Sequence, residues 1–272
     1  IGWRLATRPV PCLLRRMISA LAPARASART PRPLRGATTV ALASLVGLVL
    51  AALPARDAAA QAKPAAPLSA AQRRAMLATP THPFWRTKAP DTVALDMETS
   101  RGTMTIELIR EWAPNGVDRF YNLARAGFFD DSRFYRVLPF YIAQFGHPAS
   151  PSVGATWRER KIRPDSVRSS NVRGTITFAQ FTPRDRSTTL FINLNENVSL
   201  DSSGFAPIGR VIAGMESADS LYSGYGEIPA SPAPMGNPRR FYGESNRFLD
   251  KTYPKLDRII SVRVRADSAA TP

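Results

Sequence analysis

A strict alternation of apolar and polar residues that begins at Thr92 constrains the fold more than any other feature of the sequence. Successive side chains of a β-strand point to opposite faces, so alternation over two neighbouring segments predicts a hairpin with one buried face. Ser100-Arg101-Gly102 connects the two segments. The apolar face consists of Val93, Leu95 and Met97 before the connection and of Met104, Ile106 and Leu108 after it.

Further short strand-like stretches and two helical patterns follow this hairpin. Pro114 suits a first helical turn, apolar residues recur at helical spacing from Val117 to Ala124, and Gly127 ends the helix. Residues 214–222 form the second, shorter helical pattern. The strand-like stretches are residues 133–144, 172–181, 188–194, 208–212 and 258–265. Many strands with two helices predict a mainly-β fold, a closed barrel covered by helices.

Two long stretches inside this region show no regular period. We expect residues 148–170 to form a surface or binding loop. Residues 227–254 are rich in proline and are expected to wrap the outside of the domain.

An uncharged apolar run at residues 36–53 dominates the N-terminal part of the chain. Four arginines between residues 25 and 35 precede it, and small residues around Ala60 follow it. This order is typical of a secretory signal peptide, so we expect residues 1–62 to be a leader that is cleaved after Ala60 or Ala62. An uncleaved membrane anchor is the alternative, because about 18 apolar residues can just span a bilayer. The product is expected in the periplasm or outside the cell.

Residues 63–91 are rich in Ala, Pro and Thr and are predicted to be a surface linker, with a short helical possibility at residues 69–77. They lead into one domain at residues 92–272.

The formal net charge of the chain is +16, but residues 1–60 hold nine Arg and one acidic residue, which leaves about +8 for the remainder. That excess does not by itself indicate nucleic-acid binding.

Cysteine and metal chemistry find little support in the sequence. Cys12, the only cysteine, lies in the predicted leader, so disulfides are excluded for the exported form. His82 and His147 lack partners at metal-ligand spacing. We therefore expect neither a metal nor another cofactor.

The most informative segment is Phe-Tyr-Arg-Val-Leu-Pro-Phe-Tyr-Ile-Ala-Gln-Phe-Gly at residues 134–146. Arg136 and Gln144 interrupt an aromatic and aliphatic stretch, which is costly unless both side chains face a site. A surface ion pair of an edge-strand arginine is the alternative interpretation.

This segment resembles the hallmark of the cyclophilin family, a pattern of the type F-x-R-x-x-P-x-F-x-x-Q-x-G. Supporting segments follow in the family's order at residues 117–123, 127–129, 173–179, 190–193 and 204–211. The resemblance implies a closed, antiparallel, eight-stranded barrel capped by two helices. It also indicates that the protein is a divergent, exported bacterial member of the family. It also implies that Arg136 is the catalytic group and that Gln144 orients the arginine and the bound peptide.

The resemblance assigns eight further positions to the substrate site. Plain core packing is the alternative for the apolar ones, Phe191 and Leu200 in particular. Five positions depart from the best-known pattern, since Tyr141 replaces phenylalanine, Gln180 asparagine, Thr189 glutamine and Phe205 histidine, and Ser199 stands where many members carry tryptophan. The eight positions are Tyr141, Ile142, Ala179, Gln180, Thr189, Phe191, Leu200 and Phe205.

The function implied by the resemblance is a peptidyl-prolyl cis–trans isomerase that acts on X-Pro bonds of exported polypeptides and assists their folding. We expect a monomer, because nothing in the sequence demands a larger assembly. A chaperone or scaffold that binds proline-containing segments, with weak or lost catalysis, is the second interpretation. A third takes the basic loop at residues 158–163 as a surface for anionic polymers or membranes, although Glu159 interrupts it.

Overall fold

The computed structural model describes residues 68–227 and 238–265, so the predicted leader lies outside the described residues. The hairpin predicted at Thr92 is confirmed as β1 (Thr92–Thr99) and β2 (Gly102–Ile109), which pair antiparallel with Met97 opposite Met104. The apolar face of this hairpin is buried in the main core, as the alternating pattern requires.

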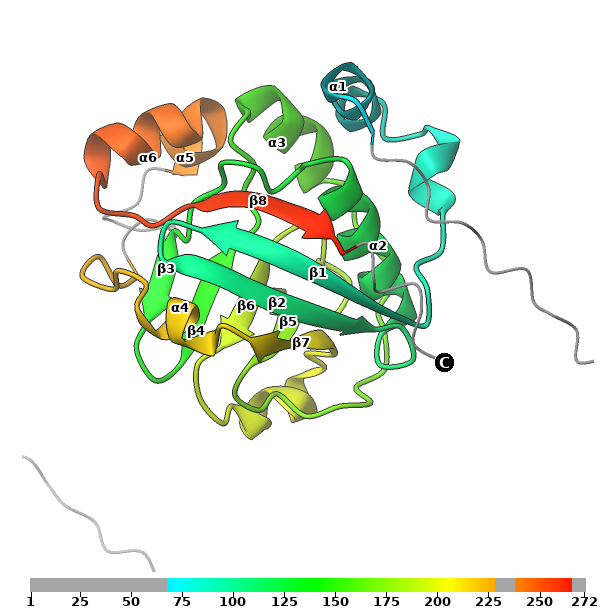
Figure 1. Cartoon of the computed structure of the whole chain (residues 1–272), viewed down its shortest axis with the longest axis vertical. Helices are drawn as coiled ribbons and strands as arrows, with labels where there is room; N and C mark the ends of the chain where they lie inside the picture. The colour runs from blue at the N-terminus through cyan, green and yellow to red at the C-terminus, as the bar shows by residue number, and fades with distance from the viewer. Residues whose placement is uncertain (1–67, 228–237, 266–272) are drawn as a thin grey trace, which may run out of the picture. The chain divides into compact units, whose positions relative to one another are not determined.

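Six further strands complete one antiparallel sheet in the order β3-β4-β6-β5-β7-β2-β1-β8 (Figure 1). Each of the predicted strand-like stretches contributes at least one of them. Their bounds are β3 (Arg136–Leu138), β4 (Ile142–Phe145), β5 (Thr175–Phe178), β6 (Leu190–Asn193), β7 (Pro207–Ala213) and β8 (Ile259–Val264).

The prediction of a closed barrel is wrong, because the sheet forms an open half-barrel. Its two end strands, β3 and β8, share no continuous ladder, and near them Arg133 and Arg258 form one isolated bridge. The physical reason is the length of β3, which has only three residues. Just before β3, the contact with the start of β8 consists of two backbone hydrogen bonds, from the amide of Ile259 to the carbonyl of Ser132 at 2.8 Å and from the amide of Phe134 to the carbonyl of Asp257 at 2.9 Å.

Both predicted helices are present, as α2 (Pro114–Arg125) and α4 (Met215–Asp219). The prediction of only two helices is wrong, since the described residues also contain α1 (Ala70–Ala78), α3 (Pro151–Arg158), α5 (Pro238–Glu244), α6 (Asn246–Thr252) and two 3-10 turns, η1 (Pro83–Arg86) and η2 (Val198–Ser203). Helix α3 lies in the first stretch predicted to be irregular, and α5 and α6 lie in the second.

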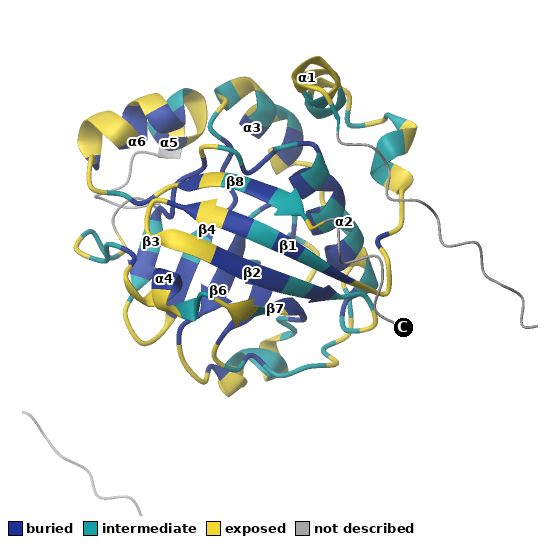
Figure 2. Ribbon diagram, viewed as in Figure 1, coloured by how far each residue is buried: buried dark blue, intermediate teal, exposed yellow. Residues whose placement is uncertain are grey.

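The three additional helices, α3, α5 and α6, form where apolar side chains become buried. Trp157 of α3 is buried in the main core, and Phe248 of α6 lies in a smaller cluster with Tyr135 and Phe241. In Figure 1, α3 lies between α1 on one side and α5 with α6 on the other. In Figure 2, α3, α5 and α6 each carry both buried and exposed residues.

Residues 68–91, predicted to be a surface linker, lie on the outside of the domain and contact it at several points. The indole rings of Trp85 and Trp157 pack edge to face with centroids 4.3 Å apart, and Nε1 of Trp157 donates a hydrogen bond to the carbonyl of Leu77 at 2.9 Å. The amide of Ala89 donates to Asp118 on α2 at 2.8 Å. This segment is therefore an integral part of the fold that covers α2 and α3.

Within residues 68–227 and 238–265 no helix has the length and apolar character needed to cross a bilayer. The apolar run at residues 36–53 is not among these residues.

Candidate active site

The segment that carries the family motif is a tight hairpin, and the single strand predicted over residues 133–144 is wrong. Strands β3 and β4 pair antiparallel, and the turn between them holds Phe140 in the left-handed region with φ of 59°. The register places Arg136 directly opposite Gln144. Directly opposed residues on a sheet have neighbouring side chains, so the hairpin brings the two polar groups together.

Arg136 and Gln144 form the start of a short chain of hydrogen bonds. Nη1 of Arg136 donates to Oε1 of Gln144 at 3.0 Å, and Nε2 of Gln144 donates to the hydroxyl oxygen of Tyr135 at 3.2 Å. Burial raises the pKa of Tyr135, so its phenol stays neutral and available as an acceptor. These two hydrogen bonds link the guanidinium of Arg136 through Gln144 to the buried phenol of Tyr135.

Glu227 holds the other side of the guanidinium. Its Oε1 accepts from Nη2 of Arg136 at 2.7 Å and its Oε2 accepts from Nε at 3.1 Å, a two-point ion pair. The hydrogen bonds from Arg136 hold the pKa of Glu227 below its usual value. No sequence pattern indicated this contact, because the two residues are 91 positions apart and Glu227 begins a stretch without a regular period.

All ten residues that the resemblance assigned to the site line one groove with a volume of about 460 Å³. Ile142 and Phe191 show only their edges to it, because each is 3 % exposed and also packs into the protein. The rings of Phe191 and Phe205 pack edge to face at 5.9 Å, and Leu200 of η2 adds to this apolar wall. The ten residues are Arg136, Tyr141, Ile142, Gln144, Ala179, Gln180, Thr189, Phe191, Leu200 and Phe205.

The chain between β5 and β6 also lines the groove and is joined to the loop that follows Leu200. The amide of Ala179 donates to the carbonyl of Thr189 at 3.0 Å, and Nε2 of Gln180 donates to the carbonyl of Ser203 at 3.1 Å. Phe181, the next residue, is 99 % exposed and lines the groove. An exposed aromatic ring next to an apolar groove offers contact area to a bound chain.

Sequence reasoning missed the end of the groove that α3 and α5 close. His147 lies there, stacked on Phe241 with ring centroids 4.4 Å apart, and is 7 % exposed. Burial lowers the pKa of His147 to about 4, and the positive charge of Arg158 acts in the same direction. The imidazole is therefore neutral at pH 7 and extends the groove as an aromatic surface.

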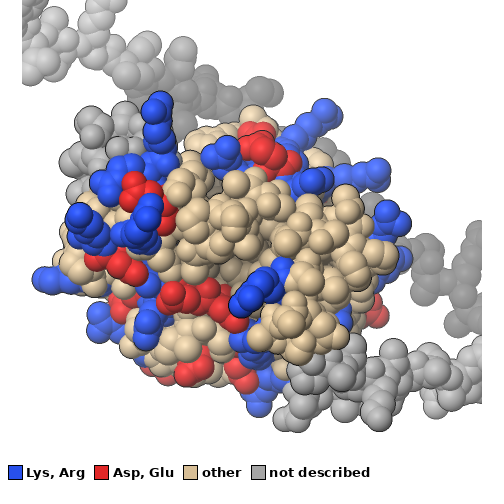
Figure 3. Space-filling view, turned by 90° about the horizontal axis from the view of Figure 1, so that it is seen from above, with Lys and Arg blue, Asp and Glu red and all other residues tan. Residues whose placement is uncertain are grey.

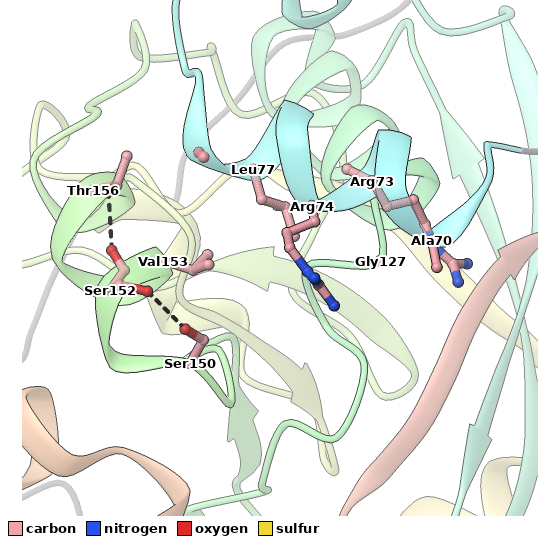
Figure 4. Close-up of a pocket in the computed structure, with 11 residues that line it drawn as sticks. Ala70, Arg73, Arg74, Leu77, Gly127, Ser150, Ser152, Val153 and Thr156 are labelled. Atoms are coloured by element: carbon pink, nitrogen blue, oxygen red, sulfur yellow. Dashed lines mark hydrogen bonds between the residues drawn. The ribbon is translucent and has the colours of Figure 1, made fainter.

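A second cavity of about 470 Å³ lies between α1 and α3, away from these residues (Figure 4). Arg73 and Arg74 of α1 border it on one side. On the other side the hydroxyls of Ser150 and Ser152 bond to each other at 2.9 Å, and Thr156 donates to the carbonyl of Ser152 at 3.0 Å. The polar groups of its α3 wall thus satisfy one another.

The basic loop at residues 158–163 is largely engaged in local contacts. Arg158 pairs with Glu159 at 3.1 Å and lies over the ring of Tyr242 at 4.9 Å, and Lys161 lies 3.9 Å from Glu159. Figure 3 shows basic and acidic side chains interspersed around a broad uncharged area on the face it presents. The part of the chain that the structure describes contains no group of three or more His, Cys, Asp or Glu placed to hold a metal ion.

The family model described as "Cyclophilin type peptidyl-prolyl cis-trans isomerase/CLD" matches residues 94–236. "Peptidyl-prolyl cis-trans isomerase A" of Dickeya dadantii is 28 % identical over 153 residues, which cover 50 % of this chain and 78 % of that protein. "Peptidyl-prolyl cis-trans isomerase ppi1" of Schizosaccharomyces pombe is 32 % identical over 124 residues, 44 % of this chain and 79 % of that protein. A solved cyclophilin type isomerase of Cryptosporidium parvum has 16 % identity and a TM-score of 0.48, and covers 66 % of this chain and 99 % of its own. The family-model match over more than half of the chain shows that the protein belongs to the cyclophilin-type peptidyl-prolyl cis–trans isomerases.

Proposed function

We propose that this isomerase acts on X-Pro bonds of exported polypeptides in the groove lined by the hairpin β3–β4, with Arg136 as its catalytic group. The single observation that carries the proposal is the position of Arg136 on the groove wall, held opposite Gln144 by the register of the hairpin.

The chemistry needed is the removal of amide resonance. Rotation about a peptide C–N bond meets a barrier of about 18 to 20 kcal/mol, because the nitrogen lone pair is delocalised into the carbonyl. A guanidinium that donates to the prolyl nitrogen as it becomes pyramidal takes up that lone pair. This interaction exists only in the twisted state, so it lowers the barrier without stabilising the ground state equally. Arginine suits the task because its donors are rigid and permanently charged.

The apolar wall would hold the proline ring while the rest of the bond turns. Ile142, Phe191 and Leu200 present apolar surface at the groove, and Phe205 extends it. The backbone around Ala179 and Gln180 also lines the groove, where an extended peptide chain could pair with it. Tyr141, Gln180, Thr189 and Phe205 differ from the best-known family pattern and are expected to set the sequence preference.

The export of the protein is supported by the sequence of its first 62 residues. The apolar run at 36–53, with arginines before it and small residues after it, fits a cleaved signal peptide. Uncatalysed X-Pro isomerisation takes tens to hundreds of seconds and can limit folding, so an isomerase outside the cytoplasm has substrates there. Mass spectrometry of the protein recovered from the periplasm of expressing cells should give an N-terminus at Gln61 or Lys63. A chain that stays in the membrane fraction with its leader intact would refute cleavage.

The enzymatic role of Arg136 is tested by exchange NMR on a short X-Pro peptide with protein that begins at Lys63. We expect the Arg136→Ala variant to lose at least about tenfold in exchange rate, which equals roughly 1.4 kcal/mol of transition-state stabilisation. Arg210→Ala is the matched control, because Arg210 is an exposed arginine of β7 that pairs with Glu107 outside the groove. A wild-type protein that shifts the peptide signals without accelerating exchange would support the alternative, a binding module for proline-containing segments.

A further inference from the structure

The two-point contact between Arg136 and Glu227 uses much of the donor capacity of the proposed catalytic group. A guanidinium carries five N–H donors. Glu227 accepts from Nε and Nη2, and Gln144 accepts from Nη1, so three of the five are engaged. The edge of the guanidinium formed by Nε and Nη2, which can bind a planar acceptor with two parallel bonds, is the edge that the carboxylate occupies.

We propose that Glu227 is an internal competitor for Arg136, which an X-Pro peptide must displace before the guanidinium can serve the twisted bond. The inference rests on the proposed role of Arg136 in isomerisation. It assigns to the segment after α4 a direct effect on substrate affinity.

The competition follows from the relative strength of the acceptors. A charged carboxylate forms shorter and stronger hydrogen bonds with a guanidinium than a neutral peptide carbonyl or a prolyl nitrogen does. The carboxylate also offsets the positive charge that would stabilise the lone pair of the pyramidal nitrogen. While the pair is closed, Arg136 is therefore a weaker donor toward a peptide.

The exposure of the two side chains makes the contact reversible. The side chain of Glu227 is 59 % exposed, whereas that of Arg136 is 19 % exposed and is also held by Gln144. The carboxylate can turn into water and regain its hydration, while the guanidinium keeps its place on the groove wall. Ion pairs with such exposure are weak, so the open state is a substantial fraction of the molecules.

The size of the effect follows from this weakness. An apparent dissociation constant is the intrinsic constant divided by the fraction of molecules that can bind. An exposed ion pair of ordinary strength closes enough molecules to weaken peptide binding by about two- to fivefold.

The test is the affinity of an N-acetylated, C-terminally amidated Ala-Ala-Pro-Phe peptide, measured by NMR titration together with its exchange rate. Glu227→Gln keeps the shape of the side chain and removes its charge. We expect the dissociation constant to fall by about two- to fivefold and the exchange rate at low peptide concentration to rise by the same factor. In an Arg136→Ala background the same substitution should change neither quantity, because the competition needs the arginine.

Glu216→Gln is the matched control. Glu216 is an exposed carboxylate on α4 and does not line the groove, so loss of its charge should leave the affinity unchanged. If Glu216→Gln tightened binding as much as Glu227→Gln, a general change in protein charge would explain the result and the inference would be overturned.

An unchanged or weaker affinity in Glu227→Gln would also overturn the inference. A lower exchange rate at unchanged affinity would show instead that Glu227 positions Arg136 for catalysis. Failure of the proposed function looks different, because wild-type protein and Glu227→Gln would then both fail to accelerate exchange.

Discussion

The hydroxyl oxygen of Tyr135 accepts a hydrogen bond from Nε2 of Gln144 at 3.2 Å. Gln144 itself accepts from Arg136, so the buried phenol supports the guanidinium through one intermediate side chain. The ring of Tyr135 packs edge to face on Phe241 with centroids 5.1 Å apart. The orientation of Arg136 thus depends on Tyr135, the residue immediately before β3, whose ring packs against Phe241 of α5.

Tyr135→Phe should reveal this dependence, because it removes the acceptor and keeps the ring. We expect kcat/KM for an X-Pro peptide to fall by about three- to tenfold, mainly in kcat, since a misplaced guanidinium affects the twisted state most. The free energy of unfolding should fall by about 1 kcal/mol. Tyr253→Phe, a buried tyrosine of the same aromatic cluster that does not line the groove, is the control. Equal rates in wild type and Tyr135→Phe would contradict the positioning role.

Asp165 ties the chain after α3 to the start of α2. It accepts hydrogen bonds from the amides of Asn115 and Gly116, both at 2.9 Å, and pairs with Arg186 at 3.1 Å. The side chains of Asp165 and Arg186 are 1 % and 2 % exposed. Removal of one partner from a buried pair leaves the other charge without compensation.

Asp165→Asn should therefore lower the free energy of unfolding by about 3 to 5 kcal/mol, measured by urea denaturation. The control makes the same chemical change in the exposed pair of Asp219 with Arg173, where Asp219→Asn should cost less than about 1 kcal/mol. Similar losses in the two variants would show that burial of the ion pair does not control its contribution.

His147 should make the stability of the protein depend on pH. Burial lowers its pKa to about 4 in the folded protein, whereas an unfolded chain restores an ordinary value near 6.5. Between about pH 4 and pH 6.5, His147 is protonated in the unfolded chain but neutral in the folded protein. The stabilisation is thus complete above about pH 6.5 and is lost as the pH falls toward 4.

This linkage corresponds to about 2 kcal/mol between pH 7 and pH 5, and the His147→Phe variant should lack it. Urea denaturation of both proteins at several pH values isolates the contribution, because the carboxylates titrate in both. Parallel pH curves for wild type and variant would rule out a depressed pKa at this position.

The segment at residues 68–91 should contribute measurably to stability. A chain that begins at Thr92 would expose the buried ring of Trp157 and remove the carbonyl of Leu77 that its indole N–H bonds. We expect a loss of about 2 to 4 kcal/mol in the free energy of unfolding relative to a chain that begins at Lys63. Trp85→Ala in the longer chain should reproduce part of this loss. Full stability of the shorter chain would restore the linker interpretation.

Sequence pattern predicted those elements whose apolar residues follow a regular period. The β1–β2 hairpin alternates over eight residues in each strand, and α2 has apolar residues at helical spacing. Helix α3 was not predicted, because it is short and places little more than Trp157 in the core. The turn between β3 and β4 escaped notice because Phe140 adopts a left-handed conformation without the glycine or asparagine that usually marks one.

The ten groove residues were predicted from a family motif, not from periodicity or composition. Phe191 illustrates the reason. It is a buried apolar residue of a strand, and in the sequence such a residue beside a groove cannot be distinguished from one that only packs in the core. Glu227 and His147 could not be predicted in this way. Their roles depend on contacts with Arg136 and Phe241, which lie far away in the sequence and outside the motif's spacing.

The edge-to-face pair of Trp85 and Trp157 has a spectroscopic consequence. Three tryptophans lie in the described part of the chain, and none of them lines the groove. Two of the three form the contact that joins η1 to α3, with centroids 4.3 Å apart. Intrinsic fluorescence therefore follows the attachment of the N-terminal segment to α3, and a fluorescent reporter of peptide binding has to be introduced at the groove rim, for example at the exposed position of Phe181.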